Sequence, residues 1–178
     1  MSTKNEESHI LDEEYWAQKD KEFEELYPDC PKAKPIECLN LIMKKTFAEQ
    51  IANGEKKLEL RAFSQHYYDR LIDKDVVNYV AAHEGDEKFQ EYLPCVNEIR
   101  PVKKIHYHNY NNSWFLDVEC KKTNIRFAAK MDAEYLYKEY GCDELLRLSR
   151  DLDAKKEEYR PCFFVFLVGK VLDTNLNT

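Results

Sequence analysis

One short segment of this 178-residue chain combines a glycine, two cations and a carboxylate at close spacing: Gly54, Lys56, Glu59 and Arg61. A carboxylate beside two cations stays ionised and holds a guanidinium in place. The arginine can then offer its remaining N–H groups to a phosphate, a carboxylate or the edge of a base. The segment therefore predicts a polar ligand-binding site, in which Gly54 has a structural role.

The residues after Gly54 alternate as a β-strand would, over residues 57–63. In a strand, successive side chains point to opposite faces, which predicts that Lys57, Glu59 and Arg61 share one face. Lys56, at the turn into the strand, would lean over that polar face. The alternative is a solvated strand face whose ion pairs contribute little to stability.

The elements before the segment would position it. Residues 36–43 form an apolar run of strand length, and residues 44–53 follow with helical spacing. Gly54 then suits a helix stop, since glycine accepts the left-handed conformation. Lys44 and Lys45 at the start of this helix oppose its dipole, so together they could attract an anion.

The stretch LNLIMKKTFAEQIANGEKKLELR, residues 39–61, resembles the ASCH domain family, whose hallmark is G-x-K-x-x-E-x-R after a strand and a short helix. This resemblance implies an α+β fold: a small PUA-like β-barrel of about five to six mostly antiparallel strands with flanking helices. It also implies that the motif lines a cleft that binds RNA, a nucleotide or a modified nucleoside. No cofactor is implied.

The resemblance leaves an enzymatic alternative open. Some small ASCH proteins are amidohydrolases that act on N4-acetylcytidine, with a lysine at the Lys56 position, a threonine at the Glu59 position and a glutamate from a later strand. This chain keeps the lysine but has Glu59 instead of the threonine. As an enzyme it would use Lys56 and Glu59 for proton transfer. Glu98 or Glu119 would supply the later carboxylate.

The rest of the chain predicts further elements, with an N-terminal extension, 1–35, preceding an ASCH/PUA-like domain, 36–178. The extension has a disordered start, one helix over 12–27 that either packs or binds a protein partner, and a proline-rich linker. In the domain we expect a helix at 64–72, strands at 76–81 and 124–128, a helical turn at 87–93, a hairpin of 102–110 with 114–120, helices at 132–140 and 143–152, and a strand at 162–172 with a bulge at Gly169.

Charge and composition narrow the class of protein. The net charge is -7, of which residues 1–35 carry -5, so the remainder is close to neutral. A broad electrostatic nucleic-acid binder normally has a basic surplus. The six cysteines lack a CxxC spacing, which argues against both a disulfide framework and a zinc site. Without a long apolar segment or a signal sequence, the chain is expected to be cytoplasmic and to have no membrane partner.

Two other groups of residues are weaker candidates. His106 and His108 have a spacing found in metal sites but lack a nearby third ligand, so no metal is expected. Trp114, beside the hairpin turn, is the first candidate for stacking on a base. The wider aromatic set from which it comes also contains Tyr67, Tyr68, Tyr107 and Tyr110.

Overall fold

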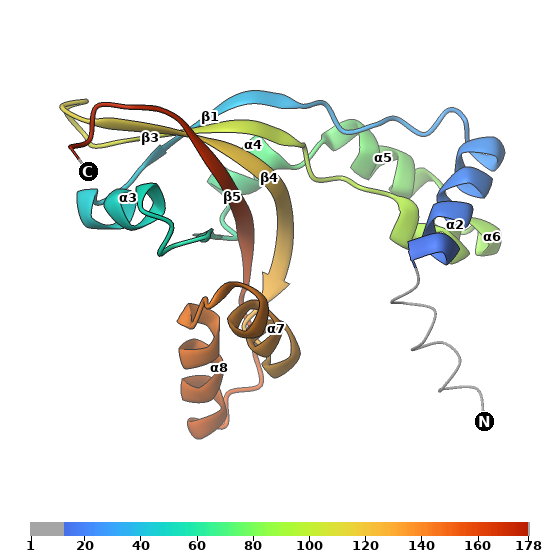
Figure 1. Cartoon of the computed structure of the whole chain (residues 1–178). Coiled ribbons are helices and arrows are strands. Elements are labelled where there is room, and N and C mark those ends of the chain that lie inside the picture. Colours follow the sequence, from blue (N-terminus) through green and yellow to red (C-terminus); the bar gives the residue numbers. More distant parts are fainter. Residues whose placement is uncertain (1–12, 178) are drawn as a thin grey trace. The chain divides into compact units, whose positions relative to one another are not determined.

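The computed structural model describes residues 13–177 and divides the chain into two compact units (Figure 1). One unit contains residues 13–33 and Ile72–Glu98, and the other contains Lys34–Leu71 and residues 99–177. The expected disordered start of the chain lies outside the described residues. The division of the chain at residue 35 into two domains stays a prediction.

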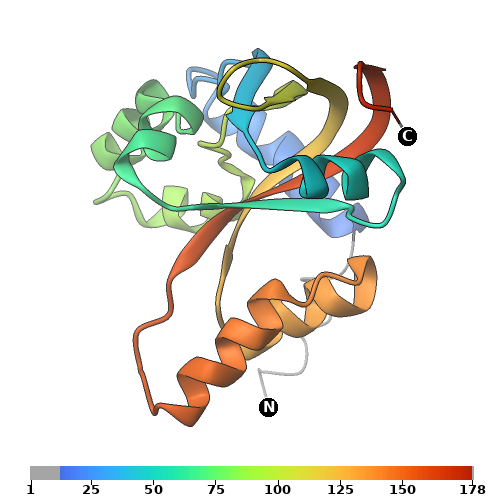
Figure 2. The same ribbon diagram turned by 90° about the vertical axis from the view of Figure 1, so that its left-hand side faces the viewer.

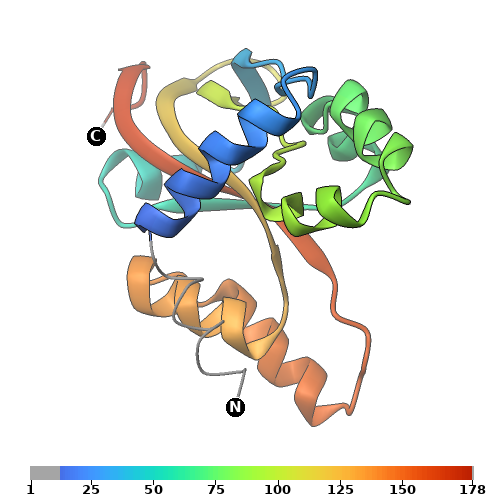
Figure 3. The same ribbon diagram turned by 90° about the vertical axis from the view of Figure 1, so that its right-hand side faces the viewer.

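The larger unit is built on one five-stranded mixed sheet with the strand order β1-β3-β4-β5-β2. The strands are β1 (Ile36–Ile42), β2 (Leu58–Ala62), β3 (Val102–His108), β4 (Phe115–Phe127) and β5 (Cys162–Thr174). Only β1 and β3 pair in parallel, and the other three pairings are antiparallel. The long strands β4 and β5 run side by side and twist strongly (Figure 3).

The sheet is not closed into a barrel, so the expected β-barrel is wrong in that respect. Its two edges, β1 and β2, are joined by side chains instead of a backbone ladder. Arg61 of β2 donates to the carbonyl of Ile42, and Arg70 donates to the carbonyl of Asn40. Two guanidinium groups thus donate hydrogen bonds to carbonyls at the outer edge of β1. They cover an edge that could otherwise pair with another chain.

Four helices of the larger unit flank this sheet. They are α3 (Lys45–Ala52), α4 (Gln65–Leu71), α7 (Lys130–Tyr140) and α8 (Glu144–Ala154). Helices α3 and α4 lie on either side of β2 in the sequence, whereas α7 and α8 lie side by side beyond one end of β4 and β5 (Figure 2). Buried leucines and alanines of α7 and α8 pack against Leu58 and Val165. Gly141, with a φ of 67°, ends α7 in the left-handed conformation.

The smaller unit consists of α2 (Glu13–Leu26), α5 (Lys74–Ala82), α6 (Glu87–Glu91) and the 3₁₀ turn η1 (Leu93–Cys95). Its core is aromatic, with Phe23 of α2 packed against Phe89 and Tyr92. Tyrosine hydroxyls donate to carboxylates around this core, namely Tyr27 to Asp86, Tyr79 to Asp29 and Tyr92 to Glu22. The predicted N-terminal helix is therefore confirmed and packs by its aromatic side. A protein partner for it stays a prediction.

Two of the predicted elements are wrong. Residues 76–81 were expected to be a strand but belong to α5, because Asp73 caps the helix by accepting a hydrogen bond from the backbone N–H of Asp75. Val76 is fully buried, so packing overrides the preference of β-branched residues for strands. Residues 124–128 do not form a separate strand, because β4 continues from the hairpin to Phe127.

The bulge expected at Gly169 is confirmed. Between two β4–β5 pairs, Val118 with Val171 and Cys120 with Val168, β5 contains one residue more than β4. A Cβ atom on Gly169 would lie 3.1 Å from the Glu119 side chain, so the carboxylate side chain lies across the glycine. The bulge thus forms where β5 lacks a side chain.

Candidate ligand-binding site

The turn after α3 sets the position of Lys56. Gly54 has a φ of 83°, which is the left-handed conformation that a side chain would strain, and its N–H donates to the carbonyl of Ile51. The N–H of Lys56 then donates back to the carbonyl of Gln50. Gly54 is therefore confirmed as the helix stop that brings the chain into β2.

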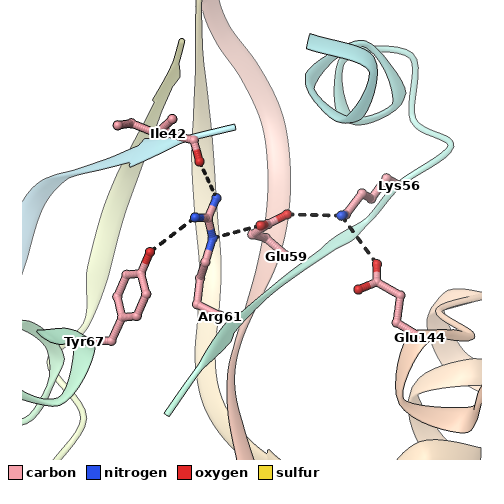
Figure 4. Close-up of polar contacts among 6 residues, drawn as sticks. All are labelled: Ile42, Lys56, Glu59, Arg61, Tyr67 and Glu144. Carbon is pink, nitrogen blue, oxygen red and sulfur yellow. Dashed lines mark hydrogen bonds and ion pairs between the residues drawn. The ribbon is translucent and has the colours of Figure 1, made fainter. Parts of the chain in front are cut away.

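Glu59 lies at the centre of a buried ion-pair network (Figure 4). Only 6% of this residue is exposed. Nε of Arg61 donates to its Oε1 at 2.9 Å, and Nζ of Lys56 lies 3.2 Å from its Oε2. The sequence prediction that Glu59 holds Arg61 in place is confirmed, and Lys56 does lean over the same carboxylate.

Arg61 uses all three of its nitrogens within the protein. Besides Glu59, Nη1 donates to the hydroxyl of Tyr67 at 3.2 Å and Nη2 donates to the carbonyl of Ile42 at 2.9 Å. Figure 4 shows the guanidinium held between these three acceptors. The side chain therefore fixes Glu59 and the edge of β1 with three of its five N–H groups, and a contact of the other two with a ligand stays a prediction.

Lys56 contacts two carboxylates and one aromatic ring. In addition to Glu59, its Nζ lies 3.5 Å from Oε1 of Glu144, the first residue of α8. The same ammonium lies 4.7 Å from the ring centroid of Phe47 on α3, within the range of a cation–π contact. The network of Lys56, Glu59, Arg61 and Glu144 thus has two positive and two negative charges and is neutral overall.

Two polar atoms of this region are buried without a hydrogen-bond partner among residues 13–177. They are Oε2 of Glu59 and the hydroxyl of Tyr107 on β3. Lys56 is within ion-pair distance of Oε2 but is not aligned to donate a hydrogen bond to it. Burial raises the pKa of Tyr107 well above its usual value, and the charge of Glu59 raises it further. Tyr107 is thus a neutral hydroxyl in the electrostatic field of Glu59.

The other predicted ligand residues lie outside this network. Lys44 and Lys57 are exposed, and Lys45 is exposed and lies 4.0 Å from Glu49, its neighbour on α3. Lys57 directly precedes β2, and only its backbone takes part in the sheet, where its carbonyl accepts from Val168. Trp114 is 7% exposed, so its ring packs inside the protein.

A carboxylate that the sequence did not single out lies beside Lys56, whereas the role of Glu98 or Glu119 stays a prediction. Glu119 lies on the opposite face of β4 from the buried Val118 and Cys120, with its side chain over Gly169. Glu98 belongs to the smaller unit. The structure instead places Glu144 beside Lys56. In sequence, Glu144 looks like an ordinary acidic residue in the first turn of a helix.

Neither a metal cluster nor a membrane helix appears in the part of the chain that the structure describes. Within residues 13–177 no group of three or more histidine, cysteine, aspartate or glutamate side chains is arranged to hold a metal ion. No described helix has the length and apolar character needed to cross a membrane.

Comparisons with known proteins give one distant likeness. No family model matches the chain, and no curated protein matches its sequence. Among solved structures, the crystal structure of a serine-to-alanine mutant of ZmASCH from Zymomonas mobilis aligns with 78% of this chain and 72% of that chain, at 12% identity and a TM-score of 0.40. A likeness at this level carries no argument about activity, and membership of the ASCH family stays a prediction.

Proposed function

We propose that the chain is a binding module for RNA, a nucleotide or a modified nucleoside, and that Lys56, Glu59 and Tyr107 recognise an uncharged hydrogen-bonding edge of the ligand. The observation that carries this proposal is a pair of buried atoms without a hydrogen bond among the described residues: Oε2 of Glu59, which has an ion pair with Lys56, and the hydroxyl of Tyr107. Buried polar groups in proteins are nearly always hydrogen-bonded, so each exception needs an explanation. A ligand that donates to Glu59 and accepts from Tyr107 would satisfy both.

The charges of the site favour a ligand that binds through an uncharged hydrogen-bonding edge over one that binds through a phosphate. The network is neutral, and Arg61 gives one N–H of each nitrogen to Glu59, Tyr67 and Ile42. A phosphate placed at Oε2 of Glu59 would be repelled by that carboxylate. An amide or amidine edge, such as a nucleobase carries, has an N–H donor beside a carbonyl oxygen or ring nitrogen that accepts, as the two atoms require.

Access to Oε2 would require only a side-chain movement. Lys56 covers this oxygen, and its flexible four-carbon stem can move away. Glu144 lies 3.5 Å from the same ammonium and would keep it paired when the ligand takes its place at Glu59. The charge of Lys56 is thus balanced both with and without ligand.

A second function, amide hydrolysis on an acylated nucleoside such as N4-acetylcytidine, has one observation in its favour. Lys56 and Glu59 are in contact at 3.2 Å, so a carboxylate and an ammonium that can exchange a proton lie side by side. In the amidohydrolases a threonine provides a hydroxyl at this position, and in this chain the position is occupied by Glu59. We therefore rank hydrolysis below binding.

A ligand screen by thermal shift tests the proposal. Free nucleosides, their 5′-monophosphates, short single-stranded RNA and inorganic phosphate are compared at low and at physiological salt. We expect a nucleoside and its monophosphate to raise the melting temperature by similar amounts, with little dependence on salt, and inorganic phosphate to have no effect. Binding through phosphate would instead weaken as salt rises.

Variants then separate binding from catalysis. Tyr107→Phe and Glu59→Gln should each weaken binding, whereas Lys45→Ala, in the exposed first turn of α3, should leave it unchanged. Release of cytidine from N4-acetylcytidine, abolished by Lys56→Ala, would establish hydrolysis. If no nucleoside or RNA shifts the melting temperature, both functions lose their support.

A further inference from the structure

His106 and His108 lie on the same face of β3, opposite to the face of the buried Tyr107. Both imidazoles are only partly covered. Their ring centroids are 5.4 Å apart and the ring planes differ by 30°. Phe115 of β4 stacks on His106 at 5.7 Å and restricts its ring.

The hydrogen bonds of the two rings leave the same nitrogen free in each. Nδ1 of His108 lies 2.8 Å from the carbonyl of Asn109, and because a carbonyl only accepts, Nδ1 carries the proton. Nδ1 of His106 lies 2.5 Å from Oδ1 of Asp117, to which it donates. Among the described residues, neither Nε2 has a hydrogen-bond partner.

This is the arrangement in which histidines bind transition metals. Such a histidine donates its other ring N–H to a carboxylate or a backbone carbonyl, which fixes the tautomer and makes the free nitrogen a better ligand. Asp117 provides the carboxylate for His106, and Asn109 provides the carbonyl for His108. Lys104 lies 3.9 Å from the other oxygen of Asp117 and balances its charge.

The two rings are stacked, with centroids 5.4 Å apart. Because each Nε2 lone pair lies in the plane of its own ring, binding of one shared ion requires the His108 ring, whose Nδ1 is bonded to the carbonyl of the neighbouring Asn109, to turn toward His106.

We infer that His106 and His108 form a two-imidazole site for a divalent transition-metal ion of the Cu²⁺, Ni²⁺ and Zn²⁺ class. The described residues offer no group of three ligands, so water completes the coordination and the site stays open on one side. Affinity follows the general order for nitrogen ligands, with Cu²⁺ bound most tightly, and the hard ions Mg²⁺ and Ca²⁺ are not bound. The site is independent of the function proposed for Lys56, Glu59 and Tyr107.

Titration calorimetry of the full chain tests this inference, with CuCl₂, ZnCl₂ and MgCl₂ as probes. The titrations use a Cys38→Ser background, because Cys38 is exposed on β1 next to β3 and its thiol would compete for soft ions. We expect one Cu²⁺ per chain, weaker Zn²⁺ and no heat with Mg²⁺. His106→Gln and His108→Gln should each lower the Cu²⁺ affinity by at least about 10-fold. His66→Gln, which removes an exposed histidine of α4, should not change it.

Asp117→Asn is the more specific test, since it keeps both rings and changes only the group behind His106. We expect about 10-fold weaker binding and unchanged stoichiometry. The electron paramagnetic resonance spectrum of bound Cu²⁺ should show hyperfine coupling to two imidazole nitrogens, reduced to one in His108→Gln. Binding that is absent at millimolar Cu²⁺, or that is the same in both histidine variants as in the parent, would overturn the inference.

Discussion

Two charged clusters of the same sheet differ in what surrounds them. The inner cluster, Lys56, Glu59, Arg61 and Tyr67, is largely removed from solvent, and the Glu59 side chain is 8% exposed. The outer cluster, Lys104, His106 and Asp117, lies on the other face of β3 and β4, where the side chain of Asp117 is 15% exposed and those of its partners Lys104 and His106 are 39% and 30% exposed. Each cluster has one carboxylate between two groups that are or can become cations, and in the inner cluster Tyr67 also accepts a hydrogen bond from Arg61.

This difference in burial determines how strongly each charge network affects the stability of the fold. In water, an ion pair gains little because solvent screens it and the side chains lose freedom. In the inner cluster, a charge left without its partner cannot return to solvent, so breaking the network costs far more than forming it gained. The same residue types should therefore give large mutational effects on one face and small ones on the other.

Glu59→Ala should have the largest effect. It leaves Lys56 and Arg61 without the carboxylate between them and should destabilise the fold by about 3–5 kcal/mol. For a chain of this size, this lowers the melting temperature on the order of 10 °C. The matched control is Asp117→Ala in the outer cluster, with an expected loss of about 1 kcal/mol. Equal losses in denaturant titrations of the two variants would contradict the comparison.

Arg61→Lys should cost about 2 kcal/mol although it keeps the charge. An ammonium cannot reach Glu59, Tyr67 and Ile42 at once, so at least one acceptor loses a charged hydrogen bond. Urea denaturation measures the loss. Arg147→Lys, at an exposed pair with Asp143 on α8, is the control and should be nearly neutral. A neutral result for Arg61→Lys would mean that the edges of the sheet do not depend on the guanidinium.

The sequence predicted the part of the inner cluster that is local. Lys56, Glu59 and Arg61 are close along the chain, and strand alternation with the stop at Gly54 was enough to bring them together. Glu144 and Tyr107 join the site only through the tertiary fold, 88 and 51 residues after Lys56 by their numbers, and no local pattern marks them. The strand begins at Leu58, one residue later than expected, and a ligand-binding role for the exposed Lys57 stays a prediction.

The open sheet was missed for a related reason. Residue patterns predicted most of the strands, and five are present, whereas the closed barrel was implied by the family resemblance. Whether the edge strands β1 and β2 pair with each other depends on which donor each backbone carbonyl at the edge of β1 meets. Here the carbonyls of Asn40 and Ile42 accept from Arg70 and Arg61, which are side chains of distant residues. Strand propensity does not contain this information.

Tyr107→Phe should have a small effect of the opposite sign. The hydroxyl is buried without a partner, so its removal should stabilise the free protein by up to about 1 kcal/mol. Burial raises the folded pKa of Tyr107 above its unfolded value near 10, so its neutral form contributes stability below about pH 10 that is lost as pH rises further. Denaturant titrations at pH 8 and pH 11 should show a smaller alkaline loss in Tyr107→Phe than in the wild type.

Tyr67→Phe is the control for that result. Its hydroxyl accepts a hydrogen bond from Arg61, so the same chemical change should destabilise the protein by about 1 kcal/mol. A Tyr107→Phe variant that loses as much stability as Tyr67→Phe would show that the Tyr107 hydroxyl is already satisfied in the free protein. The ligand-recognition role proposed for Tyr107 would then have no basis.

The smallest expected effect is the coupling of a single outer pair. A double-mutant cycle on Lys104 and Asp117, with alanine at each position, should give a coupling free energy of about 0.5 kcal/mol or less, since the ions are 3.9 Å apart and partly solvated. The same cycle on Lys56 and Glu59 should give a coupling above about 1.5 kcal/mol, because each single variant leaves a buried charge.

Added salt distinguishes the two couplings further. A concentration of 0.5 M NaCl should remove most of the outer coupling and leave the inner one nearly unchanged, because screening acts on charges that solvent reaches. An inner coupling that falls with salt as the outer one does would mean that water enters the inner cluster, and Oε2 of Glu59 would then need no ligand to satisfy it.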